Sequence, residues 1–563
     1  MNILLTTINS KYIHQNLAIR LLYELNKNHE GLSLREFSPK DDTSEIIIFC
    51  SNFNMVAFSC YIWNITQTLE VAQKIKQLNP ACKILLGGPE VSYDWKEIIA
   101  LPEIDYIILG EGEIPFSLLL KSYPILEKVS GLVWKQNGKV IENSAPEIPN
   151  LQQLQHINPY INVPDEELQH KICYIEASRG CPNCCDFCLA GLQNKVRYLP
   201  LETIQANLLY LMEKGRVIKF LDRTFNAHPA FSISIFQFVL SHYKPGNIFQ
   251  FEIKADILQE DLIAFIRLHV PKGIFRFEIG IQTLNAKSNQ EVKRKQNFEN
   301  IKTFISQISD KIEIHLDLIV GLPLDHLADI KYSFEEVFKL FTPELQLGFL
   351  KFLKGTPIRE KYKEHNYQFD PLPPYRIIES NYLSKAEIDK IALVEHALDI
   401  YWNKKRALHT LKYVALTYSI FDFLLGLGTY RKEKTGFRNN GLTEIYTTLY
   451  EFSMQHYPND ILIPELIALD YYMQHKVKPG IRFLPEISKK FRNEIFDTLK
   501  LNHHKYRYVM HTVHLSLKKL IDFGIVEPST DLLIIEYTGV EKPRIISNTE
   551  LMGVAVKIDY SNT

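Results

Sequence analysis

The most informative segment of this chain reads Tyr174-Ile175-Glu176-Ala177-Ser178-Arg179-Gly180-Cys181-Pro182-Asn183-Cys184-Cys185-Asp186-Phe187-Cys188. Four of the protein's 8 cysteines fall within the 8 positions from Cys181 to Cys188. An apolar run precedes them, so the cysteines follow a predicted strand. Such crowding of thiols in a long chain indicates a metal site.

Two groupings of the four sulfurs are open. The first, two adjoining C-x2-C pairs, would serve zinc, but structural zinc takes four tetrahedral ligands from two knuckles separated by roughly a dozen residues or more. The second is a C-x3-C-x2-C triplet of Cys181, Cys185 and Cys188, with Cys184 spare. On a glycine-entered loop after the strand 172–177, this triplet suits three irons of a [4Fe-4S] cluster and leaves the fourth iron without a thiolate. A metal-free thiol cluster would be prone to oxidation.

The triplet resembles the signature of the radical SAM superfamily, which places C-x3-C-x2-C after the first strand of a βα barrel with an aromatic, here Phe187, before the third cysteine. The resemblance implies that the open iron binds the amino and carboxylate groups of S-adenosylmethionine. It further implies that the reduced cluster passes one electron to the sulfonium, giving methionine and a deoxyadenosyl radical. An electron donor such as flavodoxin or ferredoxin is implied as well. The cofactor carries the difficult chemistry, while the protein positions it and excludes water and oxygen.

The length and charge of the chain limit the number of its domains and the kinds of partner that it can bind. The chain has 563 residues, of which 46% are hydrophobic, enough for about three or four domains with a large core. Its net charge of −1 creates no overall field for nucleic acid or an anionic membrane. Residues 1–7 lack the basic start of a signal peptide, and no apolar run reaches the roughly 18 residues of a membrane span. We therefore expect no membrane contact and a reducing cytoplasm, in which an iron–sulfur cluster persists.

Residues 1–125 alternate short apolar runs with amphipathic helical patterns, which predicts a doubly wound, Rossmann-like α/β sheet. Such sheets bind ligands at the carboxyl ends of their strands. The predicted ends are Asn9 to Asn16, Ser59-Cys60-Tyr61, Gly87-Gly88-Pro89-Glu90 and Gly110-Glu111-Gly112-Glu113.

The order of these strand ends resembles the cobalamin-binding domains that precede many radical SAM barrels. By this resemblance the corrin and its nucleotide tail would contact Asn9, Lys11, Tyr12, His14, Ser59, Tyr61, Gly87, Gly88, Gly110, Glu111 and Gly112. A flavodoxin-like domain without a ligand is the alternative. The Asp-x-His-x-x-Gly pattern that supplies an imidazole to cobalt is absent from the first loop. We therefore expect cobalamin with water or nothing on its lower face, unless His14 approaches the cobalt.

Residues 126–170 are predicted to be a linker between domains. They contain a hairpin pattern at 131–134 with Asn137-Gly138 as its turn, followed by the proline-containing segment 146–164.

Strand and helix patterns alternate again through residues 171–365. Predicted strands are 172–177, 217–221, 249–253, 274–279, 312–318 and 345–349. The resemblance implies an open, TIM-like (β/α)6 barrel with its active groups at the C-terminal strand ends. Polar residues at those ends are Asp222 to Asn226, Glu252, Lys254, Glu278, Gln282, Asp317 and Lys351. By position, the residues that would contact S-adenosylmethionine are Phe187, Asp222, Glu252, Lys254, Gln282 and Asp317.

Residues 366–563 predict a mainly α-helical domain, with long helical patterns such as 385–402 and 491–523, and we expect substrate choice to lie here. The basic and aromatic run 503–508, with His511 and His514, is compatible with RNA binding, but a solvated helix face with buried tyrosines is favoured. The spacing of His503, His504, His511 and His514 fixes no set of metal ligands.

Together these features resemble the cobalamin-binding radical SAM proteins over roughly residues 1–365, with an added helical C-terminal domain as in an uncharacterised subgroup. Three functions follow from such a resemblance: methyl transfer to an unactivated carbon or phosphorus, a cobalamin-assisted rearrangement or ring-forming reaction, or a redox or corrinoid sensor. Methyl transfer is favoured, because cobalamin is suited to methyl transfer between one S-adenosylmethionine and a substrate radical made with a second. The residues identify neither the substrate nor a catalytic side chain.

Overall fold

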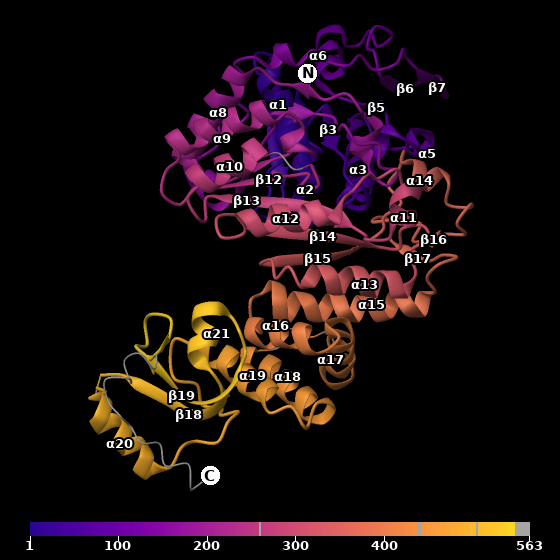
Figure 1. Cartoon of the computed structure of the whole chain (residues 1–563). Coiled ribbons are helices and arrows are strands. Elements are labelled where there is room, and N and C mark those ends of the chain that lie inside the picture. The colour runs from indigo at the N-terminus through magenta and orange to yellow at the C-terminus, as the bar shows by residue number, and fades with distance from the viewer. Residues whose placement is uncertain (258–259, 437, 439–440, 503–504, 547–563) are drawn as a thin grey trace. The chain divides into compact units, whose positions relative to one another are not determined.

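The computed structural model describes residues 1–257, 260–436, 438, 441–502 and 505–546 (Figure 1). The chain forms two compact units, the first built from Met1–Ile330 and Leu347–Lys385 and the second from Lys331–Gln346 and Ala386–Thr563. The first unit holds two α/β sheets. The second is mainly helical.

The N-terminal sheet has seven strands in the order β2-β1-β3-β4-β5-β6-β7. Its parallel strands are β1 (Ile3–Ile8), β2 (Leu32–Phe37), β3 (Met55–Ser59), β4 (Lys83–Gly87) and β5 (Tyr106–Ile108). The helices are α1 (Leu17–Leu25), α2 (Thr43–Cys50), α3 (Ile65–Leu78), α4 (Pro89–Ser92), α5 (Trp95–Ala100) and α6 (Glu113–Ser122). The predicted doubly wound architecture is confirmed.

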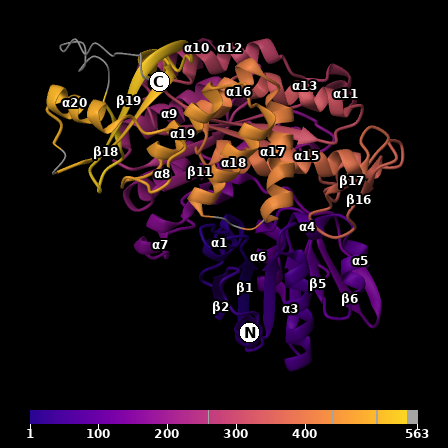
Figure 2. The same cartoon turned by 90° about the horizontal axis from the view of Figure 1, so that it is seen from below.

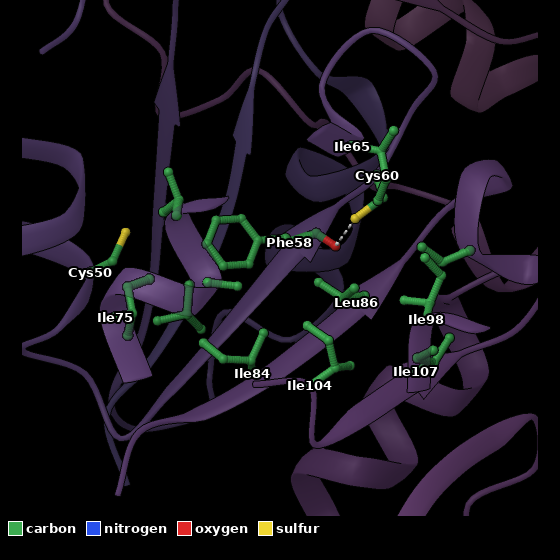
Figure 3. Close-up of a cluster of buried hydrophobic side chains, with 14 of the residues drawn as sticks. Cys50, Phe58, Cys60, Ile65, Ile75, Ile84, Leu86, Ile98, Ile104 and Ile107 are labelled. Carbon is green, nitrogen blue, oxygen red and sulfur yellow. Dashed lines mark hydrogen bonds between the residues drawn. The ribbon is translucent and has the colours of Figure 1, made fainter. Parts of the chain in front are cut away.

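Both faces of this sheet are covered by apolar residues, because successive side chains of a strand point to opposite faces. On one face Phe58, Ile84 and Leu86 pack with Ile75 of α3, in a cluster whose buried residues also include Cys60 (Figure 3). On the other face Leu85 lies in a cluster with residues of α1 and α6. Two covered faces explain why the central strands read as continuous apolar runs.

Two features of this sheet differ from the sequence prediction. Strand β2 was not predicted, because it is an edge strand whose alternating residues are only partly buried. The hairpin expected in the linker forms β6 (Leu132–Gln136) and β7 (Lys139–Glu142) and adds antiparallel strands beside β5. The sheet therefore continues beyond residue 125. The short helices η1 (Leu151–Leu154) and α7 (Asp165–His170) follow before the next sheet.

The second sheet has six strands in the order β15-β14-β13-β12-β11-β8, as the six predicted strands require. They are β8 (Ile172–Ile175), β11 (Val217–Phe220), β12 (Ile248–Glu252), β13 (Phe275–Gln282), β14 (Glu313–Val320) and β15 (Glu344–Phe349). The strand pairs from β8 to β14 are parallel, and the sheet order does not pair β8 with β15, so the barrel is open.

Helices follow the strands of this sheet. They are α8 (Leu201–Lys214), α9 (Pro229–His242), α10 (Glu260–His269), α11 (Ala286–Glu291), α12 (Phe298–Ile308) and α13 (Leu327–Phe338). Helix α9 lies between α8 and α10, and α12 lies beside α10 (Figure 1). Shorter elements are β9 (Ser178–Arg179), η2 (Leu189–Leu192), β10 (Arg197–Tyr198), η3 (Phe225–Ala227), α14 (Pro357–Glu360), β16 (Gln368–Phe369) and β17 (Ile377–Glu379).

The two faces of the six-stranded sheet differ in chemistry. Every second residue is buried and apolar, and stacked rings such as Phe220 on Phe251 join neighbouring strands on that face. The intervening residues are partly exposed and most of them are polar, and the strand register aligns them across the sheet: Tyr174 pairs with Lys219, and Lys219 pairs with Gln250. The helices therefore cover the apolar face, and a polar face is left for ligands.

The second unit contains α15 (Lys385–Leu398), the π-helical turn η4 (Asp399–Asn403), α16 (Leu408–Thr417), α17 (Ile420–Thr435), α18 (Leu442–His456), α19 (Leu462–Met473), α20 (Lys489–Leu499) and α21 (Leu517–Phe523). An antiparallel sheet of β18 (Arg507–Leu515), β19 (Pro528–Tyr537) and β20 (Arg544–Ile545) completes it. Figure 2 shows β18 beside β19.

The long helix expected over residues 491–523 is wrong, because β18 occupies its centre. Consecutive residues from Tyr508 to His511 are all buried, so both faces of the strand are covered and no solvated helix face exists there. The ring of His511 stacks on Tyr472 with centroids 5.4 Å apart, and burial lowers its pKa. His514 pairs instead with Glu465 at 2.6 Å. His503 and His504 lie outside the described residues. No helix within the described ranges combines the length and apolarity needed to cross a bilayer.

Candidate active site at the cysteine loop

The cysteine loop begins at a tight corner after β8. Gly180 has φ +95°, and a Cβ there would lie 2.5 Å from the carbonyl oxygen of Lys195, so the close approach requires glycine. The Cys181 N–H donates to the Gln193 carbonyl at 3.0 Å. The two-residue ribbon of β9 and β10 thereby fixes the base of the loop.

The loop distinguishes its four cysteines by burial. Cys181 and Cys185 are buried, Cys188 is half-buried and Cys184 is exposed. The Cys181 sulfur lies 3.3 Å from the Thr224 hydroxyl. Burial raises the pKa of the Cys185 thiol, and Arg294 counteracts this rise through its charge and a hydrogen bond. The arrangement separates Cys184 from the triplet predicted to bind the cluster.

Asp186, between the second and third predicted ligands, anchors the loop to two distant segments. Its buried carboxylate pairs with Lys293 at 2.9 Å and with Lys361 at 3.0 Å. Its N–H donates to the Val292 carbonyl, and its carbonyl accepts from the Ile358 N–H, each at 3.1 Å. Sequence reasoning missed these anchors; the only signal was the basic run Lys293-Arg294-Lys295.

The thiols of the triplet are ligands of the type that an iron–sulfur cluster takes. Within the described part of the chain, no three His, Cys, Asp or Glu side chains converge as a site for one metal ion. Thiolates of a four-iron cluster bind separate irons, so they need not converge on one point. The Arg294 guanidinium beside Cys185 favours a deprotonated sulfur at that position, against the effect of burial.

Asp222 lies at the carboxyl end of β11 but is directed at the protein. Its carboxylate accepts from the Ala177 N–H at 2.9 Å and from the Ser178 hydroxyl at 2.5 Å. Burial raises the pKa of this carboxyl to about 7. Asp222 therefore holds the corner between β8 and the cysteine loop, a role that its position in the sequence did not reveal.

Glu252 and Lys254 lie at the end of β12 and approach the loop. Glu252 pairs with Arg223 at 3.1 Å, and burial nevertheless raises its pKa. The Lys254 ammonium donates to the Asn183 amide oxygen at 3.0 Å, and Asn183 in turn donates to the Cys181 sulfur at 3.5 Å. A cation thus lies one residue away from the first predicted cluster ligand.

Gln282 and Asp317 lie on the two neighbouring strands. Gln282 has the left-handed φ of +69°, at a register shift of β13, and its buried amide oxygen has no hydrogen-bond partner among the described residues. Asp317 pairs with His315 at 3.1 Å. An amide oxygen without a partner, on a residue with a left-handed backbone at a strand end, fits a site that a polar ligand completes. Phe187 is half-buried within the loop.

Lower on the same polar face, Lys219 donates to both oxygens of Glu278 at 2.7 and 2.9 Å. The Gln250 amide also donates to Glu278. Glu278, a predicted strand-end residue, is therefore held inside a network of side chains.

The first loop of the N-terminal sheet contacts the start of β8. The His14 Nδ1 lies 2.5 Å from the Tyr174 hydroxyl, and the Ile172 N–H donates to the Ile13 carbonyl at 2.8 Å. Burial lowers the pKa of His14. One imidazole nitrogen is thus engaged by the barrel. Tyr12 is exposed and lies under the ammonium of Lys171, 5.1 Å from its ring centroid.

Other predicted cobalamin contacts lie at the carboxyl edge of the same sheet. Asn9 donates to Glu36 at 2.6 Å, and Tyr61, whose hydroxyl interacts with Ser59, stacks on Trp63 with centroids 4.4 Å apart. Lys11 is exposed, and a side chain at Gly87 would meet only a carbonyl oxygen 3.9 Å away. Between His14 and Asn16, the buried amide of Gln15 has no hydrogen-bond partner among the described residues for either its nitrogen or its oxygen. These features fit an edge that a ligand covers.

The turn from Gly110 to Glu113 contacts the barrel through its acidic side chains. The Glu111 carboxylate pairs with Arg179 at 2.7 Å and with Arg197, and Glu113 pairs with Arg179 at 2.6 Å. These arginines, which sequence reasoning missed, hold the pKa of Glu111 below its usual value against the opposing effect of burial. The acidic side chains therefore bind the barrel, and Gly110 and Gly112 remain at the strand edge.

A second contact joins the same two sheets. Glu90 is the second residue of α4. Its carboxylate pairs with Lys354 at 3.5 Å and accepts a hydrogen bond from the Tyr375 hydroxyl. All of these side chains are buried.

Three family models match the chain. A B12 binding domain matches residues 3–120, the radical SAM superfamily matches residues 175–337, and a protein of unknown function, DUF4080, matches residues 363–535. The first two matches overlie the two sheets of the first unit, and the third falls largely in the second unit.

Among curated proteins, the chain is 26% identical over 189 residues to 2-(S-pantetheinyl)-carbapenam-3-carboxylate methyltransferase of Streptantibioticus cattleyicolor, covering 31% of this chain and 28% of that protein. It is 30% identical over 149 residues to the cobalamin-dependent radical SAM methyltransferase TokK of Streptomyces tokunonensis, covering 24% and 22%. The chain thus spans less than two thirds of these relatives. The solved structure of OxsB, a cobalamin-dependent S-adenosylmethionine radical enzyme with aqua-cobalamin and S-adenosylmethionine bound, shares the fold, with a TM-score of 0.59 and 15% identity over 84% of this chain and 79% of that chain.

Proposed function

We propose, from the premise that this chain is a cobalamin-binding radical SAM protein, that it transfers a methyl group from S-adenosylmethionine to an unactivated carbon or phosphorus centre. One observation carries the proposal: the cysteine loop and the ligand edge of the N-terminal sheet lie in one unit and are joined by direct ion pairs through Arg179. Two cofactors held at these places would lie within reach of one substrate.

When bound, the [4Fe-4S] cluster supplies one electron for cleavage of the sulfonium of S-adenosylmethionine, and cobalamin supplies methyl-transfer chemistry. Cys181, Cys185 and Cys188 would hold the cluster. The residues that would bind S-adenosylmethionine are Phe187, Glu252, Lys254, Gln282 and Asp317, with Asp222 fixing the corner of the loop. Asn9, Lys11, Tyr12, Ser59, Tyr61, Gly87, Gly88, Gly110 and Gly112 would contact the corrin.

The chain's own side chains would orient the reactants. Lys254, held at the loop by Asn183, places a positive charge where a carboxylate of S-adenosylmethionine would be neutralised. The unpartnered Gln282 oxygen would accept a hydrogen bond from the ligand. Below them, the Lys219–Glu278 pair makes the floor of the site polar, which favours a substrate that forms hydrogen bonds.

We expect cobalamin to bind without an imidazole ligand, because the Asp-x-His-x-x-Gly pattern is absent from the first loop. The contact between the His14 Nδ1 and Tyr174 directs this imidazole toward the barrel.

We further propose an electron donor such as flavodoxin or ferredoxin, because the cluster must be reduced, and a cytoplasmic location, because a reducing compartment preserves the cluster. The domain division proposed is 1–125 for cobalamin, 126–170 for the linker, whose hairpin of β6 and β7 extends the N-terminal sheet, 171–365 for the barrel and 366–563 for the C-terminal domain. The last of these would select the substrate.

The test of the cluster compares two adjacent cysteines. Anaerobically reconstituted protein should bind about four irons and form 5′-deoxyadenosine from S-adenosylmethionine on reduction. Cys185→Ala should lose both properties, whereas the matched control Cys184→Ala should keep them, because Cys184 is exposed and outside the triplet. Equal loss in the two variants would refute the assignment.

The test of the reaction is the product ratio with a candidate substrate. Methyl transfer predicts that S-adenosylhomocysteine and 5′-deoxyadenosine form together. Deoxyadenosine without S-adenosylhomocysteine would indicate a rearrangement or ring-forming reaction instead, and neither product under strong reduction would indicate a sensor.

A further inference from the structure

One guanidinium joins the two proposed cofactor sites. Arg179 pairs with Glu111 at 2.7 Å, with Glu113 at 2.6 Å and with Glu176 at 3.0 Å. Glu111 and Glu113 belong to the turn after β5, and Glu176 follows β8. Arg197, the cross-strand partner of Arg179 in the β9–β10 ribbon, pairs with Glu111 as well.

The network is enclosed, so its geometry is fixed. The Arg179 side chain is 13% exposed, and those of Glu111 and Glu113 are 18% and 10% exposed. Charges removed from water interact strongly and tolerate few alternative arrangements, and a planar guanidinium distributes its donors in fixed directions. The three carboxylates and two guanidiniums carry a net charge of −1. Loss of either arginine would therefore leave a further buried carboxylate without a compensating positive charge.

Each end of the network continues into a ligand-bearing loop. Arg179 is followed directly by Gly180, whose conformation admits no side chain, and then by Cys181. At the other end Glu111 lies between Gly110 and Gly112, which are at the strand edge. Because Arg179 joins the turn to the cysteine loop, a change that cobalamin causes in the turn would reach the loop, and a change that the cluster causes in the loop would reach the turn.

We propose that Arg179 is a positioning residue that couples the two cofactor sites, so that an assembled cluster tightens cobalamin binding. The inference rests on the proposed binding of both cofactors. Coupling of this kind is reciprocal, so cobalamin also stabilises the cluster loop.

The experiment titrates the full-length protein with aquacobalamin and follows its visible spectrum, once with the cluster reconstituted and once without it. We expect the cluster to tighten binding at least about fivefold, within the range that coupling between sites usually covers. Arg179→Met should reduce that ratio to about twofold or less, because methionine keeps much of the volume but none of the charge. Glu113→Gln, a milder variant that leaves Arg179 and Glu111 in place, should reduce the ratio in the same direction.

Lys354→Met is the matched control. It removes a buried cation that also joins the N-terminal domain to the barrel, at Glu90, but that pairs with none of the three carboxylates around Arg179. This variant should keep the fivefold ratio even if it binds cobalamin more weakly.

The outcomes separate the inference from the proposed function. A wild-type ratio near one, or a full ratio in both Arg179→Met and Glu113→Gln, overturns the coupling while cobalamin binding stands. Equal loss of the ratio in Lys354→Met also overturns it, because any weakened domain contact would then suffice. If wild type binds no aquacobalamin under either condition, the proposed function fails together with the inference.

Discussion

Gly355→Ala is expected to loosen the contact between the N-terminal domain and the barrel. Gly355 has φ +81°, and a Cβ there would lie 2.3 Å from atoms of the Tyr93 ring. Tyr93 is the C-cap residue directly after α4, at the ligand side of the N-terminal sheet. Gly246 offers a matched control, because its φ is +94° and a Cβ there would meet nothing within 4 Å.

The two substitutions share one cost and differ in another. A left-handed backbone costs alanine about 1–2 kcal/mol at either position. Reduced freedom of the unfolded chain offsets part of this equally in both. Overpacking against the Tyr93 ring adds about 1–3 kcal/mol at Gly355 alone. Gly355→Ala should therefore destabilise the protein by about 1–3 kcal/mol more than Gly246→Ala.

Urea unfolding followed by circular dichroism measures this difference from the midpoints at a common slope. In a double-mutant cycle, Tyr93→Ala should remove most of the extra cost of Gly355→Ala, because it deletes the ring. Equal midpoints for Gly355→Ala and Gly246→Ala, or a clash that persists without the ring, would refute the reasoning.

Three further changes test the site. Asp222→Asn should flatten the pH dependence of stability, because burial raises the pKa of the native carboxyl to about 7, and it therefore keeps a proton that the unfolded carboxyl, with a pKa of about 3.9, releases. In wild type the stability should thus fall by up to about 4 kcal/mol as pH rises from about 4 to 7, and thermal midpoints that fall as steeply in the variant would contradict this. Gln15→Leu should weaken aquacobalamin binding about tenfold, since its buried amide has no hydrogen-bond partner among the described residues, and unchanged affinity in a spectroscopic titration would show that the corrin does not engage it. His14→Ala should leave the visible spectrum of bound cobalamin unchanged, and an altered spectrum would make His14 the cobalt ligand.

The sequence predicted those elements whose burial leaves a periodic pattern. The six barrel strands were predictable because each alternates buried apolar with polar residues or forms an apolar run, and the cysteine triplet because its ligands are local. Strand β18 was not, because Tyr508 to His511 are buried on both faces and carry no period of two.

Contacts between distant residues account for the rest. Arg179 and Glu111 are 68 positions apart, and Asp186 and Lys361 are 175 apart. Each of these charged residues alone is indistinguishable from a solvated surface residue. Only the fold shows that they are buried pairs, and with them that the acidic turn binds the barrel through its carboxylates.

The hydrogen bond from the Ile172 N–H to the Ile13 carbonyl has a consequence for handling the barrel alone. Strand β8 ends the order of its sheet, with β11 on one side, and the first loop lies along its other side through the His14–Ile172 bridge. Removal of residues 1–125 would leave the Ile172 N–H unpaired, although the Tyr160 hydroxyl would still bond the N–H and the carbonyl of Tyr174. An unpaired group on a strand edge is a template for intermolecular pairing. We therefore expect the excised barrel to self-associate more readily than the full-length chain, because the N-terminal domain covers part of this strand edge.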